Sequence, residues 1–341
     1  MSLKNRRTVA AAIAPLLLAA LAACGSSSAR SQAPESAWAA PTLRVGDQKG
    51  SAAQALLDAS GQSKDLPYRI SWSSFTSGPP MLEAIGAGSV DLGSVGDTPP
   101  VFAGAANRPV KVVGAVRASA AGDAVLVPKG SGVTGIAALK GRTIAVAQGS
   151  SSHYTLVALL LKAGLSPADV HLSYLQPADA LAAFNSGKID AWAVWDPYTA
   201  MAEQAGGRVL ATGEGVTAGL SFAVASTSAL ADQARSKLVG DYLQRLRAAQ
   251  HWAATHPEEW AQVWSKQTGI PYDVALTSVR RTQATSFGVA LDDDAVRSEQ
   301  AIADTFAGQK LIPASFSFAD FTDRRFNARL PASTTQLPPP S

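Results

Sequence analysis

The sequence predicts an α/β protein made of two similar lobes, each a sheet with helices on both faces. Short β-branched runs alternate with segments of helical pattern between residues 43 and 210. This order is typical of parallel sheets covered by helices. The segment LEAIGAGSVD at 82–91 also recurs as LAAFNSGKID at 181–190, at a constant offset of 99 residues. The repeat indicates that one helix–strand–loop unit is used twice.

The predicted elements follow one another at short intervals. Strands are expected at 43–45, 68–72, 90–92 and 110–113 in the first lobe, and at 143–147, 170–174, 191–194 and 208–210 in the second. Helices are expected at 52–58, 80–87 and 99–106. From residue 232 onward the pattern is helical. Trp252, Trp260 and Trp264 recur there at helical spacing, which favours core packing over a binding cage.

The repeated unit predicts where a ligand would bind. Gly88 and Gly187 are expected to stop helices in the left-handed conformation, and Asp97 and Asp196 to stand at helix starts, each followed by a Pro within two positions. Ligands of open α/β sheets bind beyond the carboxyl ends of the strands. Two facing lobes would therefore surround one cleft with comparable loops.

Four strand-to-helix loops are rich in Gly, Ser and Thr. They lie at 48–51, 76–79, 96–98 and 149–153. Such loops aim free backbone N–H groups and the positive end of a helix at the cleft, and their hydroxyls add donors. Any one loop alone is explained by ordinary helix capping. Four in repeated positions favour a site for an oxyanion.

Catalytic and metal sites are disfavoured by the spacing of the candidate residues. His153 lies too close in sequence to Ser150 and Ser151 to serve them as a base, and no G-x-S-x-G elbow occurs. His251 and His256 are five residues apart and do not share a helix face. The chain also has no H-x-x-x-H pair, no Walker loop and no G-x-G-x-x-G after a strand.

The segment Trp195-Asp196-Pro197-Tyr198 follows an apolar run at 191–194. Two interpretations are open. The rings could wall an organic substituent while Asp196 accepts hydrogen bonds, or the segment could be a capped helix with packed aromatics.

The N-terminus predicts secretion and a lipid anchor. Residues 1–23 have a basic start and an apolar run of about 15 residues, shorter than the ~20 that span a bilayer, and so resemble a signal peptide. The run Leu21-Ala22-Ala23-Cys24 resembles the lipobox of bacterial lipoproteins, with Cys24 as the lipidated residue. Residues 24–41 are expected to form a flexible tether and 331–341 a disordered tail.

The composition argues against a disulfide-bonded protein and against a nucleic-acid-binding protein. Cys24 is the only cysteine, so no disulfide is expected. The net charge of +3 disappears once Lys4, Arg6 and Arg7 are removed with the signal, leaving 26 basic against 26 acidic residues. No dense basic patch indicates a nucleic-acid partner.

The loops together resemble those of aliphatic-sulfonate-binding proteins of ABC importers. The resemblance covers residues 42–330 and is carried by VGDQKGS, SGPPMLEA, GSVDLGSVGDTPP, GSSSH and DAWAVWDPY. It implies the type II periplasmic-binding fold, with a mixed sheet flanked by helices in each lobe and two crossover strands. The expected lobes are 42–121 with 222–330, and 122–221.

The resemblance also implies ligand-binding residues. It places Gln48, Ser77, Gly78, Asp97, Ser150, Ser151, Trp195 and Tyr198 in the cleft. The loop pattern adds Lys49, Thr98, Ser152 and His153, the Trp195–Tyr198 segment adds Asp196, and the return segment at 219–222 adds Ser221. Asp97 is expected to act as a helix cap that orients donors without touching the sulfonate. Leu220 stands where relatives tend to have Gly, and is expected to narrow or reshape the cleft.

The implied function is capture of aliphatic sulfonates for sulfur uptake by a monomeric lipoprotein on the periplasmic or extracytoplasmic face of a membrane. Its partners would be a membrane permease with its ATPase, and no cofactor or metal is implied. Taurine, nitrate and aromatic sulfonates remain alternative ligands. An enzyme such as a desulfinase is the other alternative, but that type needs a Cys in the first loop, where this chain has Asp47 and Gln48.

Overall fold

The computed structural model describes residues 40–330. The signal peptide, the Cys24 lipidation site, nearly all of the tether and the disordered tail were predicted for segments that lie outside the described residues. Among the described residues, none of the helices is both long enough and apolar enough to cross a membrane.

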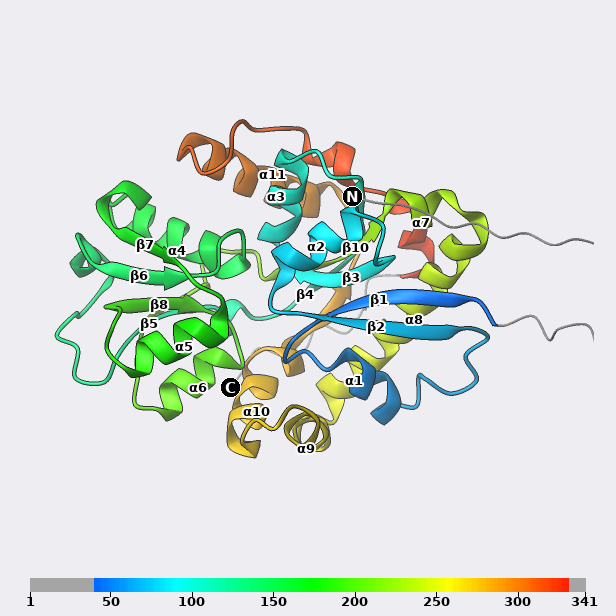
Figure 1. Ribbon diagram of the computed structural model, residues 1–341, viewed down its shortest axis with the longest axis horizontal. Helices are drawn as coiled ribbons and strands as arrows, with labels where there is room; N and C mark the ends of the chain where they lie inside the picture. Colours follow the sequence, from blue (N-terminus) through cyan, green and yellow to red (C-terminus); the bar gives the residue numbers. More distant parts are fainter. Residues whose placement is uncertain (1–39, 331–341) are drawn as a thin grey trace, which may run out of the picture. The chain divides into compact units, whose positions relative to one another are not determined.

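The first lobe is built on a six-stranded sheet of order β11-β4-β10-β3-β1-β2 (Figure 1). Its strands are β1 (Thr42–Gln48), β2 (Arg69–Phe75), β3 (Leu92–Gly96), β4 (Val110–Arg117), β10 (Leu220–Ser226) and β11 (Phe287–Val289). Strand β1 pairs in parallel with β2 and β3, whereas β10 runs antiparallel to β3 and β4. The sheet is therefore mixed.

The second lobe repeats this plan on a five-stranded sheet of order β7-β6-β8-β5-β9. Its strands are β5 (Ala124–Val127), β6 (Thr143–Val146), β7 (His171–Tyr174), β8 (Ala191–Val194) and β9 (Arg208–Thr212). Strand β6 is parallel to β7 and β8, and β5 is antiparallel to β8 and β9. The eight strands that the alternation predicted run in one direction within each sheet. The alternation missed β5, β10 and β11, which run antiparallel to their neighbours and make both sheets mixed. The mixed α/β fold implied by the resemblance is confirmed.

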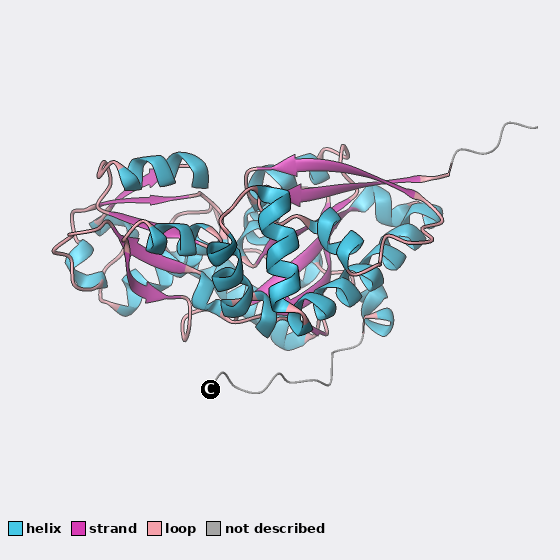
Figure 2. Ribbon diagram, turned by 90° about the horizontal axis from the view of Figure 1, so that it is seen from below, coloured by secondary structure: helices cyan, strands magenta, loops and turns pink. Residues whose placement is uncertain are grey.

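Helices cover both faces of the strands (Figure 2). They are α1 (Ala53–Ala59), α2 (Gly78–Gly86), α3 (Thr98–Ala105), α4 (Ser151–Lys162), α5 (Pro177–Asn185), α6 (Tyr198–Gln204), α7 (Thr227–Ala231), α8 (Gln233–Thr255), α9 (Pro257–Thr268), α10 (Tyr272–Arg281) and α11 (Asp293–Gly308). In β5, Val125 and Val127 join the core beneath α4, whereas Ala124 and Leu126 join the core beneath α5 and α6. Alternate residues are thus buried on opposite faces.

The chain passes between the two sheets twice, through residues 118–123 after β4 and residues 213–219 after β9. The internal repeat is confirmed, because Gly88 (φ 74°) and Gly187 (φ 66°) follow α2 and α5 in the left-handed conformation. Trp260 and Trp264 are buried in the core of the first lobe with their rings stacked, as the helical spacing predicted.

Candidate ligand-binding site

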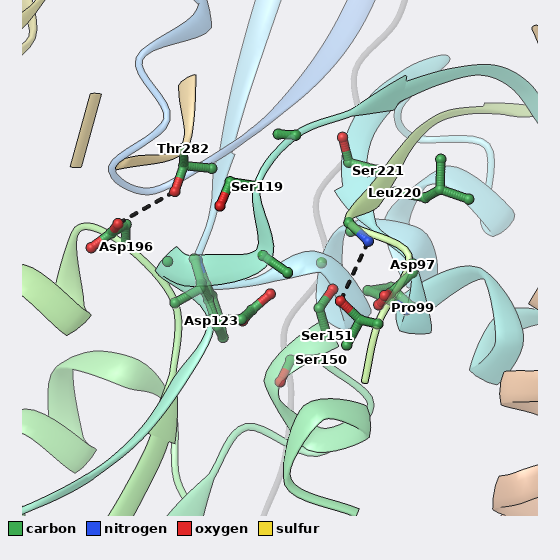
Figure 3. Close-up of a pocket in the computed structure, with 18 of the residues that line it drawn as sticks. Asp97, Pro99, Ser119, Asp123, Ser150, Ser151, Asp196, Leu220, Ser221 and Thr282 are labelled. Carbon is green, nitrogen blue, oxygen red and sulfur yellow. Dashed lines mark hydrogen bonds between the residues drawn. The ribbon is translucent and has the colours of Figure 1, made fainter. Parts of the chain in front are cut away.

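Two adjoining cavities lie between the lobes, at the carboxyl ends of β1, β3 and β8. The first has a volume of about 190 Å³ and the second about 310 Å³. Figure 3 shows the first cavity, with Ser150 and Ser151 at the start of α4 and Asp123 and Ser119 on the segment between the lobes. The residues that line both cavities are Gln48, Gly96, Ala118, Trp195, Asp196, Ser221 and Thr282.

Most of the predicted site residues line these cavities. Those of the first cavity are Gln48, Gly78, Asp97, Ser150, Ser151, Trp195, Asp196 and Ser221. Lys49 lies at the second cavity and is exposed. The structure places the other five predicted residues in neither lining, namely Ser77, Thr98, Ser152, His153 and Tyr198. In this structure these five residues lie outside the cavity walls, and each has a physical reason.

Three of the five are hydroxyl residues that are fully buried and bonded within the protein. Ser77 donates to the side-chain carbonyl of Gln176 at 2.9 Å, across the two lobes. Thr98 donates to Asp97 at 2.9 Å, and Ser152 donates to Asp123. These hydroxyls hold the site together but do not face the cavities.

His153 is buried behind the first turn of α4 and does not face a ligand. Its Nδ1 accepts the Gly149 N–H at 3.2 Å, and its ring centroid lies 5.1 Å from that of Phe306 and 5.6 Å from that of Tyr174. Burial lowers the pKa of His153 to about 4, so the ring is neutral at pH 7. His153 therefore makes no contact among the described residues through which it could serve as a base for the Ser150 or Ser151 hydroxyl.

Tyr198 also turns inward. Its ring packs edge-on against Trp192 at 6.0 Å, in the core beneath α5 and α6. Of the two aromatics in the Trp195–Tyr198 segment, only Trp195 lines the cavities. The Trp195 ring therefore fits the interpretation as a cavity wall, and the Tyr198 ring fits the interpretation as a packed aromatic.

The donors that remain for a ligand are mainly backbone N–H groups. The Ser150 hydroxyl donates to the Ala147 carbonyl at 2.7 Å and accepts the His153 N–H at 3.3 Å, as an N-cap. The next N–H groups, of Ser151 and Ser152, have no acceptor within the helix because they belong to its first turn. Ser221, at the start of β10, has a hydroxyl without a hydrogen bond among the described residues.

Three carboxylates line the first cavity. Burial raises the pKa of Asp97, raises that of Asp123 to about 7, and raises that of Asp196 to about 6 against the opposing effect of Arg281. Asp97 stands at the N-cap position of α3, but its side chain makes no cap hydrogen bond. It accepts the hydroxyls of Thr98 and Ser151 instead. The expected capping role of Asp97 is therefore corrected.

The sequence that forms this site is similar to known proteins. The model of the NMT1-like family matches residues 42–266. The chain belongs to this family. A protein of Escherichia coli K12 with the provisional name aliphatic sulfonates-binding protein is 36% identical over 80% of this chain and 85% of its own length. The resemblance inferred from the loops is thereby confirmed.

Solved structures agree with this placement in the NMT1-like family. The alkanesulfonate-binding protein SsuA of Xanthomonas axonopodis pv. citri, bound to MOPS, has a TM-score of 0.76 and 33% identity over 83% of this chain and 98% of its own. SsuA of Escherichia coli has a TM-score of 0.70 and 32% identity over 88% of this chain and 94% of its own. Both of these relatives are named as binding proteins.

Sequence reasoning missed part of the cavity lining. The segments between the lobes contribute Ala118, Ser119, Ala120, Gly122, Asp123, Thr217 and Gly219, and the end of α10 contributes Thr282. The predicted site residues lie mainly in strand-to-helix loops, whereas these residues lie where the chain crosses between the sheets. The two crossover strands implied by the family resemblance were the signal that could have predicted these residues. Leu220, which was singled out as a departure, is buried and lines the first cavity.

Proposed function

We propose that this protein captures an aliphatic sulfonate between its lobes and delivers it to the permease and ATPase of an ABC importer for sulfur uptake. The observation that carries the proposal is the start of α4, where Ser150 and Ser151 line a cavity shared by both lobes and the first-turn N–H groups have no acceptor within the helix. The names of relatives that are 33% and 36% identical over most of this chain support the same ligand class.

The chemistry of a sulfonate suits these donors. A sulfonate is a monoanion with three acceptor oxygens and no proton to give. Each hydrogen bond to a charged group contributes roughly 1.5–3 kcal/mol. Three or four of them, less the costs of desolvation and association, reach micromolar affinity, about −8 kcal/mol. A helix N-terminus supplies such donors without a buried countercharge.

The alternative ligands and the enzyme alternative have less support. A taurine ammonium would need an ionised carboxylate. Asp196 already lies 3.2 Å from the Arg281 guanidinium. Burial raises the pKa values of Asp97 and Asp123, which favours their neutral forms. A desulfinase would need a Cys thiol in the first loop. This chain has Asp47 there, and the Asp47 carboxylate accepts the Ala53 N–H at 2.9 Å. A desulfurization enzyme, DSZB, shares the fold with a TM-score of 0.57 and 15% identity, which concerns the fold alone.

The test is a thermal-shift and calorimetric panel of ethanesulfonate, hexanesulfonate, MOPS, taurine, nitrate and sulfate. A ligand at 100 times its Kd stabilises the folded state by about 2.7 kcal/mol. We expect stabilisation by the alkanesulfonates and MOPS, and none by nitrate or sulfate. Stabilisation by taurine or nitrate alone would redirect the proposal to that ligand. No stabilisation by any member would reject it.

The location proposed for the protein is the extracytoplasmic face of a membrane, held by a lipid on Cys24. Support comes from the residues before Cys24, which resemble a signal peptide with a lipobox. Expression of the full chain and of a Cys24→Ala variant, followed by membrane fractionation, tests the anchor. The full chain should fractionate with membranes and the variant should not. Equal membrane association of both proteins would reject the lipid anchor.

A further inference from the structure

The first cavity has acidic walls, although the proposed ligand is an anion. Three carboxyl groups line it, those of Asp97, Asp123 and Asp196, and they come from three different segments of the chain. None of the described residues that line this cavity is Lys, Arg or His. An ionised carboxylate that faces a sulfonate across so small a space repels it. Each carboxyl group must therefore be paired or protonated when a sulfonate binds.

Two of these three carboxyl groups have partners within the protein. Asp196 lies 3.2 Å from the Arg281 guanidinium, which compensates its charge. Asp97 accepts the hydroxyl of Thr98 at 2.9 Å and also that of Ser151. Both groups therefore have hydrogen-bond or ion-pair partners other than a ligand.

Asp123 differs, because only one of its two carboxyl oxygens has a partner. Its Oδ1 accepts the Ser152 hydroxyl from α4, whereas its Oδ2 has no hydrogen bond to any residue that the structure describes. Figure 3 shows Asp123 next to Ser150 and Ser151 at the start of α4, where the free backbone N–H groups lie. Oδ2 is therefore the oxygen left for a ligand that those N–H groups hold.

The surroundings of Asp123 favour its protonated form. Burial, followed by the charges of Asp97 and Asp196, raises the pKa of Asp123 to about 7, although the Ser152 hydroxyl opposes this effect. His153 supplies no positive charge, because burial lowers its pKa to about 4. On the elements around Asp123, the charged or titratable groups nearest the cavity are Asp97, His153, Asp196, Glu203, Glu214 and Arg281. An anion that binds beside Asp123 raises its pKa further.

Glu299 shows that this region already keeps one carboxyl group neutral. It is fully buried on α11, and neither of its carboxyl oxygens has a hydrogen bond to the described residues. Burial, together with the nearby Asp97, raises the pKa of Glu299 well above its ordinary value. A sulfonate would add another negative charge to this acidic region, which makes protonation of its carboxyl groups more favourable still.

We propose that Asp123 binds the sulfonate as a neutral carboxylic acid and that capture of the ligand takes up a proton. Ser152 holds Oδ1, and the proton on Oδ2 is donated in a hydrogen bond to a sulfonate oxygen, beside the backbone N–H groups of α4. Above pH 7 the Asp123 carboxyl of the free protein is largely ionised, so binding takes one proton from solvent and release returns it. The proposal rests on the proposed function.

The first part of the test uses the unmodified protein with ethanesulfonate and hexanesulfonate, which do not titrate between pH 5 and pH 9. Calorimetry should show a Kd that is nearly constant below pH 6 and rises about tenfold for each pH unit above pH 7. A pH-stat at pH 8 should record about one proton taken up for each ligand bound. A Kd that changes less than threefold between pH 6 and pH 9, without proton uptake, would overturn the inference and leave the proposed function intact. Absence of binding at every pH would reject the proposed function itself.

The second part of the test replaces the carboxyl group by an amide of the same shape. In Asp123→Asn, the amide oxygen can accept the Ser152 hydroxyl while the NH₂ group donates to the ligand at every pH. At pH 8 this variant should bind at least threefold more tightly than the unmodified protein and take up almost no proton. Asp179→Asn, at an exposed position on α5, is the matched control and should keep the original pH profile and proton uptake. If Asp123→Asn takes up as many protons as the unmodified protein, another group binds the proton and the proposal is wrong.

Discussion

The Arg281 guanidinium lies 3.2 Å from the Asp196 carboxylate, and the two side chains are only 17% and 8% exposed. Arg281 ends α10, which packs on the first lobe, whereas Asp196 follows β8 of the second lobe. The same guanidinium lies 2.6 Å from Glu203 in α6. Asp196 lines both cavities, so this ion pair between the lobes lies at the edge of the ligand site.

Arg281→Met should destabilise the protein by about 2–3 kcal/mol at pH 7.5, because it leaves a buried carboxylate without its partner. The loss should be smaller at pH 5, since the Asp196 carboxyl already has a pKa of about 6 and takes up a proton more readily once the guanidinium is gone. Urea unfolding at the two pH values measures both effects.

The matched control for Arg281 is Arg280→Met. Arg280 pairs with Glu258 at 2.6 Å, but both side chains are more than half exposed. Solvent and salt screen such a pair, so little or no change in stability is expected. Equal destabilisation by the two variants would show that the Arg281 pair has no special role.

Gly96→Ala should weaken sulfonate binding at least tenfold. A Cβ at Gly96, on β3 of the first lobe, would overlap the Oγ of Ser151 at the start of α4 in the second lobe. The two lobes could then not approach as closely as they do here. Gly132→Ala is the control, because a Cβ there meets nothing within 4 Å.

A double variant separates this steric effect from other consequences of Gly96→Ala. Ser151→Ala removes the overlapping oxygen and leaves a Cβ contact of 3.1 Å, which small shifts can accommodate. Calorimetry should therefore show tighter binding by the Gly96→Ala/Ser151→Ala protein than by Gly96→Ala alone. If the double variant binds no better, overlap with Ser151 is not the cause.

Features that depend on local sequence were predictable in this chain. Gly88 and Gly187 follow their helices as expected, because a left-handed position after a helix selects Gly whatever the rest of the fold. Strands β5 and β10 were missed, because their place in the sheets depends on antiparallel pairing with strands distant in sequence. The bond from Ser77 to Gln176 joins residues 99 apart in sequence, so local reasoning could not show that this hydroxyl is already used.

Asp123→Asn should stabilise the protein increasingly as the pH rises from 4 to 7. Burial holds the pKa of Asp123 at about 7, well above that of an exposed Asp, with smaller contributions from Asp97 and Asp196. Between the two pKa values the folded state keeps a proton that the unfolded state has lost, so wild-type stability falls as pH rises. Asn stays neutral at every pH and avoids this loss.

The gain for Asp123→Asn should reach about 4 kcal/mol at pH 8, because the pKa of about 7 lies about three units above that of an exposed Asp and each unit corresponds to about 1.4 kcal/mol. Thermal and urea unfolding of the variant and wild type between pH 4 and pH 8 measures it as a difference, which removes the titration of the other groups. Asp58→Asn, at an exposed carboxylate of α1, is the control. A difference between variant and wild type that does not change with pH would contradict the effect assigned to burial.

Ser221→Ala and Ser150→Ala should have opposite signatures, although both residues line the first cavity. The Ser221 hydroxyl is free to donate to a sulfonate, and loss of one hydrogen bond to a charged group corresponds to roughly 1.5–3 kcal/mol of binding free energy, at least tenfold in Kd. The Ser150 hydroxyl is engaged as the N-cap of α4. Its loss should cost about 1 kcal/mol of stability.

Measuring both Kd and Tm for each variant tests this distinction. Ser221→Ala should keep its Tm and lose affinity, whereas Ser150→Ala should lose a few degrees of Tm and bind less than threefold more weakly. Two serines of the same cavity would then divide between ligand binding and helix capping, according to what their hydroxyls already bond. If Ser150→Ala weakens binding as much as Ser221→Ala does, the Ser150 hydroxyl exchanges its partner when the ligand arrives, and the assignment of backbone N–H groups as the main donors is wrong.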